Sequence, residues 1–250
     1  MSGTDANAAA EFLSELFRYS QSLVFIISKS ESGEVPAGNI APHIFTREKD
    51  RMREFTREWD QPGREVFFCA TTVKIVGPFK IEFSELVALH ACLDLKNIAA
   101  RRKRIERAIE ALPLRPQFVV FSGHGFHCYW LLQEPLPFTG KNIARVEAAL
   151  HKLADVLAGD PSACKCTRRM RLPGSHNTMA GSSLPVEIVQ QRPGRYCLER
   201  IEAWLATAYP VLHHTKAYLD DLWAENDQLR RWAEAEEADD DGLWAEIDRY

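Results

Sequence analysis

Residues 117–132 read QFVVFSGHGFHCYWLL, and this stretch says most about the fold. Apolar residues on both sides of a short turn with two glycines indicate two strands joined as a hairpin. Gly123 and Gly125 would let backbone N–H groups come close to an anion, and His127 on the outgoing strand could donate to a phosphate oxygen. The alternative is a plain hairpin with a core histidine, which this stretch alone leaves open.

Further strands and helices are expected on both sides of this hairpin. Apolar runs of strand composition precede and follow it, and two segments show the three-four apolar spacing of helices. The strands are expected at 66–75, 86–95 and 185–189, and the helices at 97–113 and 141–158. The later helix stops at Gly159, a residue suited to a C-terminal cap. This order predicts an α+β fold, with a mixed sheet covered by helices and a helical C-terminal appendage.

The chain is expected to divide into three regions. Residues 1–63 should hold a helix within the first 20 residues, a strand at 23–27 and, from residue 29 onward, a loop with a lid-like segment. Residues 64–197 should form the core of the domain. Residues 198–250 should form a helical, acidic appendage.

The charge is unevenly distributed along the 250 residues. The net charge is −4, but residues 220–250 carry twelve acids and three bases, so residues 1–219 have a net charge of +5. The basic excess fits a polyanionic partner, and the acidic end fits an appendage or a docking peptide. The six cysteines are expected to be reduced. With neither a signal sequence nor an apolar run of spanning length, the sequence predicts a cytoplasmic protein with no membrane segment.

A second cluster of polar residues ends an apolar strand. Residues 89–96 read LHACLDLK. An unpaired buried carboxylate is costly, so Asp94 needs a partner. A divalent metal ion is one explanation, and an ion pair with Lys96 or a nearby arginine is the other.

A third cluster follows the helix expected at 141–158. Residues 159–177 read GDPSACKCTRRMRLPGSHN. Asp160 stands at the helix terminus, and three arginines follow it before a Pro-Gly turn. One segment therefore supplies an acid for a metal ion and cations for an anion.

The three clusters, in this order, resemble the motifs of the archaeo-eukaryotic primase superfamily. Its plasmid and phage members carry an apolar strand that ends in an acid-x-acid pair, then S-G-x-G-x-H-x-Y-W, then an Asp followed by R-L-P-G-[ST]-x-N. This chain has HACLDLK, SGHGFHCYW, and GD followed by RRMRLPGSHNT, all within residues 89–190. The sequence is therefore similar to RepB-like primase domains, most specifically in the second and third motifs.

The resemblance implies a DNA primase or primase-polymerase of a plasmid, phage or other mobile element, with residues 64–197 as its catalytic core. Mg²⁺ or Mn²⁺ would be the cofactor, without an organic cofactor, and would activate the primer 3′-oxygen for nucleotidyl transfer. Single-stranded template DNA and (d)NTPs would be partners. A separate replicative helicase would be a further partner, because the sequence contains no helicase P-loop.

The resemblance also implies a role for individual residues. Asp94 and Asp160 would be metal ligands, and His127 would join them as a catalytic residue. The residues expected at the nucleotide and its phosphates are Ser122, Gly123, Gly125, His127, Arg168, Arg171 and His176.

This chain departs from the family pattern at the acid-x-acid pair. We take Asp94 as the second acid, so that Cys92 replaces the first, and a soft thiol suits Mg²⁺ poorly. Lys165 also stands where many relatives carry an acid. Two hypotheses follow: an active enzyme with a weakened metal site in which Cys92 is at most a third ligand, and an impaired relative that binds nucleotide or DNA as a replication initiator or adaptor.

The helix expected at 97–113 has one apolar side and one basic side. Four basic residues follow one another on the exposed side, from Arg101 to Arg104. We favour a solvated face as the explanation, and direct contact with DNA is the alternative.

Overall fold

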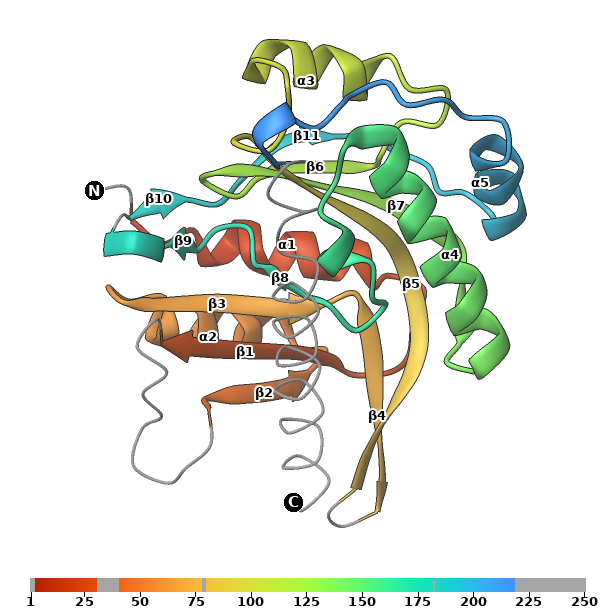
Figure 1. Ribbon diagram of the computed structural model, residues 1–250. Helices are drawn as coiled ribbons and strands as arrows, with labels where there is room; N and C mark the ends of the chain where they lie inside the picture. The colour runs from red at the N-terminus through yellow and green to blue at the C-terminus, as the bar shows by residue number, and fades with distance from the viewer. Residues whose placement is uncertain (1–2, 31–40, 78–79, 182, 219–250) are drawn as a thin grey trace.

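The computed structural model describes residues 3–30, 41–77, 80–181 and 183–218, which form two larger sheets and a short ribbon (Figure 1). One sheet has the order β11-β6-β7-β5-β4, the other β2-β1-β3-β8, and the ribbon pairs β9 with β10. All of these strand pairs are antiparallel. The strands are β1 Val24–Ser30, β2 His43–Thr46, β3 Arg64–Cys69, β4 Thr71–Gly77, β5 Lys80–Asp94, β6 Phe118–Phe121, β7 Gly125–Pro137, β8 Arg169–Arg171, β9 His176–Asn177, β10 Leu184–Pro185 and β11 Glu187–Gln191.

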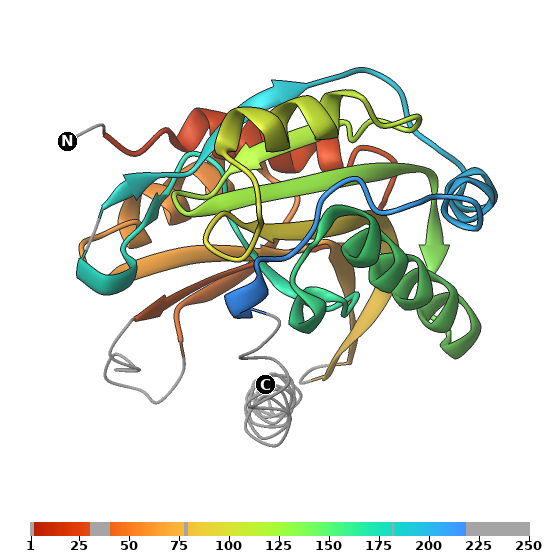
Figure 2. The same cartoon turned by 45° about the horizontal axis from the view of Figure 1, so that its top comes forward.

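Three helices cover one face of the five-stranded sheet, and the other face meets α1 and the four-stranded sheet (Figures 1 and 2). The helices are α1 Ala6–Leu16, α2 Lys49–Trp59, α3 Arg102–Glu110, α4 Gly140–Leu157 and α5 Leu198–Leu205, with 3-10 turns η1 Pro161–Ala163 and η2 Met179–Gly181. The α+β architecture predicted from the sequence is confirmed. No helix among the described residues is long and apolar enough to cross a membrane.

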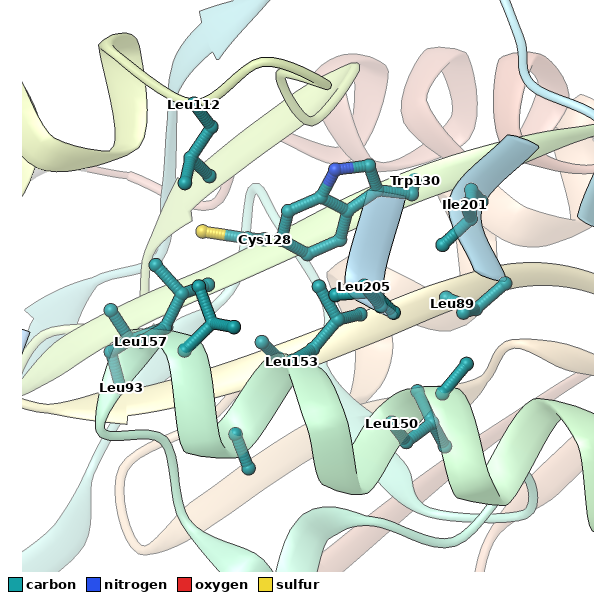
Figure 3. Close-up of a cluster of buried hydrophobic side chains, with 14 of the residues drawn as sticks. Leu89, Leu93, Leu112, Cys128, Trp130, Leu150, Leu153, Leu157, Ile201 and Leu205 are labelled. Atoms are coloured by element: carbon teal, nitrogen blue, oxygen red, sulfur yellow. The ribbon is translucent and has the colours of Figure 1, made fainter. Parts of the chain in front are cut away.

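The larger core lies between the five-stranded sheet and α3, α4 and α5. Leu150, Leu153 and Leu157 on one side of α4 point toward Leu89 of β5 and Trp130 of β7 (Figure 3). Each of these side chains is at most 1% exposed. Burying each of the leucines contributes about 1.5–3 kcal/mol, so this face alone fixes α4 on the sheet.

A second core lies between the two sheets and includes α1. The ring of Phe12 meets Phe68 of β3 and Phe118 of β6 edge-on, with centroids 5.3 and 5.0 Å apart. Neighbouring residues of a strand face opposite sides, and Leu93 of β5 belongs to the helix-side core. Cys92 and Asp94, on either side of Leu93, therefore face the four-stranded sheet.

Residues 29–63 contain more regular structure than the expected loop. The structure places β2 and α2 there, and residues 31–40 lie outside the described part. Helix α2 buries Met52, Phe55 and Thr56 at helical spacing. Its sequence KDRMREFTREW is so rich in charge that two apolar side chains were too weak a signal to reveal the period.

Two local expectations need correction. The run at 66–75 is two strands in different sheets, because the chain bends at Ala70 between β3 and β4. The left-handed residue that ends α4 is Ala158, with φ of 50°, and not Gly159. The acidic segment at 220–250 lies outside the described residues.

Candidate active site

The end of β5 carries Cys92 and Asp94 on the face toward the four-stranded sheet. Cys92 lies opposite His127 of β7, and Asp94 lies opposite Gly125. The Asp94 carboxylate accepts a hydrogen bond from the Lys96 N–H at 3.0 Å, and its second oxygen is 3.5 Å from the Lys96 ammonium. The Lys96 side chain is 79% exposed, so solvent weakens this ion pair and leaves Asp94 accessible to another cation.

The loop after α4 brings Asp160 to the same end of β5. The Asp160 N–H donates to the carbonyl of Cys92 at 2.8 Å. A Cβ on the preceding Gly159 would lie 3.1 Å from that same oxygen, so glycine permits this close approach. The Asp160 carboxylate accepts from the backbone N–H and the hydroxyl of Ser162, both at 2.9 Å, which fixes its orientation.

The Cys92 thiol contacts Met170, with the two sulfur atoms 3.6 Å apart. Burial raises the pKa of Cys92 to about 12, and Arg168 opposes this shift without cancelling it. The thiol is therefore neutral near pH 7 and adds no hard anionic ligand. Across the described residues, no three His, Cys, Asp or Glu side chains are arranged to hold a metal ion. Asp94 and Asp160 present carboxylate oxygens at this end of β5.

His127 is buried between the two sheets, with 8% of its surface exposed. Burial lowers its pKa to about 3, and the charges of Arg171 and Arg168 act in the same direction. The ring is therefore neutral and has one N–H to donate. Its Nδ1 atom is buried and has no hydrogen-bond partner among the described residues, which is unusual for a buried nitrogen.

The turn between β6 and β7 needs both of its glycines, Gly123 for its backbone conformation and Gly125 for close packing. Gly123 has φ of +93°, and a Cβ on Gly125 would lie 2.0 Å from the carbonyl oxygen of Leu93. The Ser122 N–H and hydroxyl both donate to the Gly125 carbonyl, at 2.9 and 3.3 Å. The amide of Asn177 donates to the Ser122 carbonyl at 2.6 Å. The Ser122 hydroxyl is thus used within the turn, and its contact with a nucleotide stays a prediction.

Arg171 of β8 is held by a carboxylate that the sequence gave no reason to single out. Its Nε donates to Glu65 of β3 at 2.7 Å, and its guanidinium lies 5.7 Å from the centre of the Phe67 ring. Arg171 and Arg168 both act on the pKa values of His127 and Cys92. These two arginines therefore lie near the end of β5, as their proposed contact with phosphate requires.

His176 of β9 pairs with Asp60, a residue that the sequence analysis did not single out. The backbone N–H of His176 donates to one carboxylate oxygen of Asp60, and the ring Nδ1 lies 2.8 Å from the other oxygen. The Asp60 side chain is only 1% exposed. This pairing anchors β9 to the end of α2, and the role of His176 at a phosphate stays a prediction.

His90 supports the Asp160 turn and was missed from the sequence. Its Nε2 lies 2.8 Å from the carbonyl of Ala163, the last residue of η1. Burial lowers the pKa of His90 to about 4, so the neutral ring donates this hydrogen bond. The sequence did hold a signal: His90, Cys92 and Asp94 alternate along β5 and share one face.

A segment after α5 also reaches the carboxylates. The Thr215 N–H donates to the Asn97 carbonyl at 2.8 Å, and the ring of His214 stacks on Tyr218 with centroids 4.3 Å apart. Burial raises the pKa of Tyr218, and the negative charges of Asp160 and Asp94 add to this shift. Nothing in the sequence pattern connects this segment with β5.

The fold is similar to the folds of solved primase domains. No protein-family model and no curated protein matches the chain in sequence. The fold resembles the archaeo-eukaryotic primase domain of the cyanophage S-2L primase-polymerase, with a TM-score of 0.55 and 14% identity over 80% of this chain and 97% of that one.

Two structures of the primase RepB′ are also similar. One has a TM-score of 0.53 and 11% identity, over 92% of this chain and 69% of that one. The other, its catalytic domain in complex with initiator DNA, has a TM-score of 0.51 and 10% identity, over 80% of this chain and 96% of that one. At these identities the likeness establishes the fold, as the three motifs predicted.

Proposed function

We propose that this chain is a DNA primase or primase-polymerase domain that catalyses metal-dependent nucleotidyl transfer on a single-stranded DNA template. The observation that carries the proposal is the hydrogen bond from the Asp160 N–H to the Cys92 carbonyl, at 2.8 Å. It holds Asp160 at the end of β5 near Asp94, beside the buried His127. The primase fold and the order of the three motifs support the same activity.

Asp94 and Asp160 would hold one Mg²⁺ or Mn²⁺ ion. Both are partly exposed and present carboxylate oxygens, the ligands that these hard ions prefer. When bound, the ion would activate the primer 3′-hydroxyl and neutralise charge on the triphosphate. Because Cys92 is a neutral thiol, we expect weaker metal binding than at a site with three carboxylates. We propose no organic cofactor.

His127 would contribute a hydrogen bond to a phosphate oxygen. Its ring is neutral, so it would contribute no charge, and the positive charge at the phosphates would come from Arg168 and Arg171. The backbone N–H groups of Gly123 and Gly125 are candidates for the same anion. The protein would accelerate the reaction by positioning and charge neutralisation and not by covalent chemistry.

The proposed partners are single-stranded template DNA, (d)NTPs and a separate replicative helicase, in the cytoplasm of a cell that carries a plasmid, phage or other mobile element. Residues 64–197 would be the catalytic core, with 1–63 completing the fold. The acidic appendage within 198–250 is our candidate for contact with the helicase, because its charge would repel DNA.

A labelled-dNTP extension assay on primed and unprimed single-stranded DNA, with Mg²⁺ or Mn²⁺, tests this proposal. Asp160→Asn should reduce product formation by at least ~100-fold, because it removes one of the two carboxylates that would hold the metal ion. Asp155→Asn is the matched control, since Asp155 is an exposed residue of α4, and it should retain wild-type activity. Equal activity of the Asp160 variant and wild type would refute the proposal.

The second candidate function is a catalytically impaired initiator or adaptor that binds nucleotide or DNA. The neutral thiol of Cys92 in the first acid position favours it. Cys92→Asp restores the missing carboxylate and should raise activity if the rest of the site is intact. Nucleotide binding without product in both wild type and Cys92→Asp would favour the adaptor.

A further inference from the structure

Helix α3 exposes a strongly basic surface. Ile105 and Ile109 are at most 1% exposed and face the core. The opposite side of the helix and the residue before it carry five exposed cations, which we call the α3 basic surface. Its members are Arg101, Arg102, Lys103, Arg104 and Arg107.

Few acids neutralise this surface. Glu106 pairs with Arg102 at 2.9 Å, and Glu110 is already engaged with Arg115 and Arg192. Within the described residues, the other four members of the α3 basic surface form no ion pair. From residue 96 to residue 107 there are six bases and one acid, whereas the whole chain has a net charge of −4. A solvated face that had no ligand would gain nothing from this concentration of like charge.

The α3 basic surface begins at Arg101, seven residues after Asp94 at the end of β5, and lies on the face of the five-stranded sheet opposite to Cys92. The Arg102 guanidinium lies 4.0 Å from the centre of the Phe121 ring and 5.6 Å from that of Phe126. Both rings pack on the helix side of the sheet, whereas His127, the residue after Phe126 in β7, faces the other side. Helix α3 lies on the outer side of the five-stranded sheet, after the turn that follows Asp94 (Figures 1 and 2).

We propose that the α3 basic surface binds the sugar-phosphate backbone of the single-stranded template next to the active site. This inference rests on the proposed function and extends it by assigning part of the template path. Arginine and lysine side chains that lack acidic partners attract a polyanion and release its counterions, whatever its sequence. The template would then be held beside the end of β5 by charge, without base recognition.

The test compares two variants of the full chain that lose the same charge in different places. One replaces Arg101, Lys103, Arg104 and Arg107 by glutamine. The matched control replaces four exposed bases on α2 and α4 by glutamine. The control positions are Arg51, Arg57, Lys141 and Lys152. Binding of fluorescent oligo(dT) to each variant is measured by anisotropy at several salt concentrations. The extension activity of each variant is measured at a saturating concentration of template.

The α3 variant should bind oligo(dT) at least about tenfold more weakly at low salt. The slope of log Kd against log salt should fall by roughly 2–3, because each phosphate that the protein no longer neutralises lowers this slope by about 0.7. The control should stay within about twofold of wild type in Kd. Unchanged binding by the α3 variant, or equally weakened binding in both variants, would overturn the inference and leave the proposed activity standing if wild type extends primers.

Two other outcomes also count against the inference. Tighter DNA binding by the α3 variant would mean that the surface serves another anion, such as the acidic segment 220–250 of the same chain. A wild-type chain that binds no single-stranded DNA would reject this inference and the proposed function together. All substituted positions are exposed, so we expect both variants to fold, and circular dichroism checks this.

Discussion

Replacing Glu65 by glutamine should weaken the fold and strengthen anion binding at the same time. Glu65 accepts a hydrogen bond from Arg171 at 2.7 Å, and the two side chains are only 12% and 17% exposed. Removing one partner of a buried ion pair costs about 3–5 kcal/mol, because the remaining charge has no counterpart. The contact of Arg171 with Phe67 survives and some solvent reaches both groups, so we expect the lower end, about 3 kcal/mol.

This magnitude translates into a thermal shift that circular dichroism can measure. At roughly 2–4 °C per kcal/mol for a domain of this size, Glu65→Gln should lower Tm by about 6–12 °C. Glu58→Gln, at an exposed position of α2, is the control and should change Tm little. Combining Glu65→Gln with Arg171→Gln completes a double-mutant cycle, in which the coupling free energy should be about 2–3 kcal/mol.

Glu65→Gln should have the opposite effect on nucleotide binding, which we expect it to strengthen. Without Glu65, the Arg171 guanidinium forms an ion pair with no other carboxylate in the described part of the chain, so a labelled dNTP should bind more tightly to Glu65→Gln than to wild type. Additive effects in the cycle would disprove the energetic coupling of the pair. Weaker dNTP binding in Glu65→Gln would show that Arg171 does not lie at the phosphates.

Two further predictions follow from the buried groups around the site. Gly125→Ala should lower the free energy of unfolding by about 1–3 kcal/mol, because its Cβ would lie 2.0 Å from the Leu93 carbonyl oxygen. Gly140→Ala, with open space at its Cβ, should cost nothing, and urea denaturation of both variants checks the contrast. Acid should also destabilise the protein, because burial lowers the pKa of His90 to about 4 and of His127 to about 3 from 6.5. Between pH 6.5 and these lowered pKa values the unfolded chain binds more protons than the folded one, so this stability is complete above pH 6.5 and is lost as pH falls toward 3. Urea midpoints should therefore decline over that interval, and less steeply in His127→Gln; a pH-independent midpoint would contradict neutral, buried rings.

The parts of the fold that sequence reasoning recovered are those that local patterns determine. The hairpin at 117–132 follows from apolar runs around two glycines, and the helix at 141–158 follows from its three-four apolar spacing. Cys92 and His127 were placed on separate strands, and the register that sets them opposite each other needed the structure. Helix α2 was missed because its charge outweighs the two apolar residues that it buries.

The rest of the site depends on contacts between residues far apart in the chain. Glu65 and Arg171 are 106 positions apart, and Asp60 and His176 are 116 apart. No periodicity links such pairs. The sequence therefore indicated which residue types the site needs, but not that His176 would pair with Asp60.

The pairing of β8 with β3 has a consequence for how the protein folds during synthesis. Strand β3 is made early, and the bend at Ala70 then leads the chain into the other sheet. Cys69 cannot pair with Arg169 until β5, β6, β7 and α4 have all left the ribosome. Until then one edge of β3 is open to pairing with another nascent chain, a known route to aggregation. The step that closes this edge is also the one that brings Arg171 beside Glu65, so a chain acquires the cation that we propose for phosphate binding only when this edge of β3 is covered.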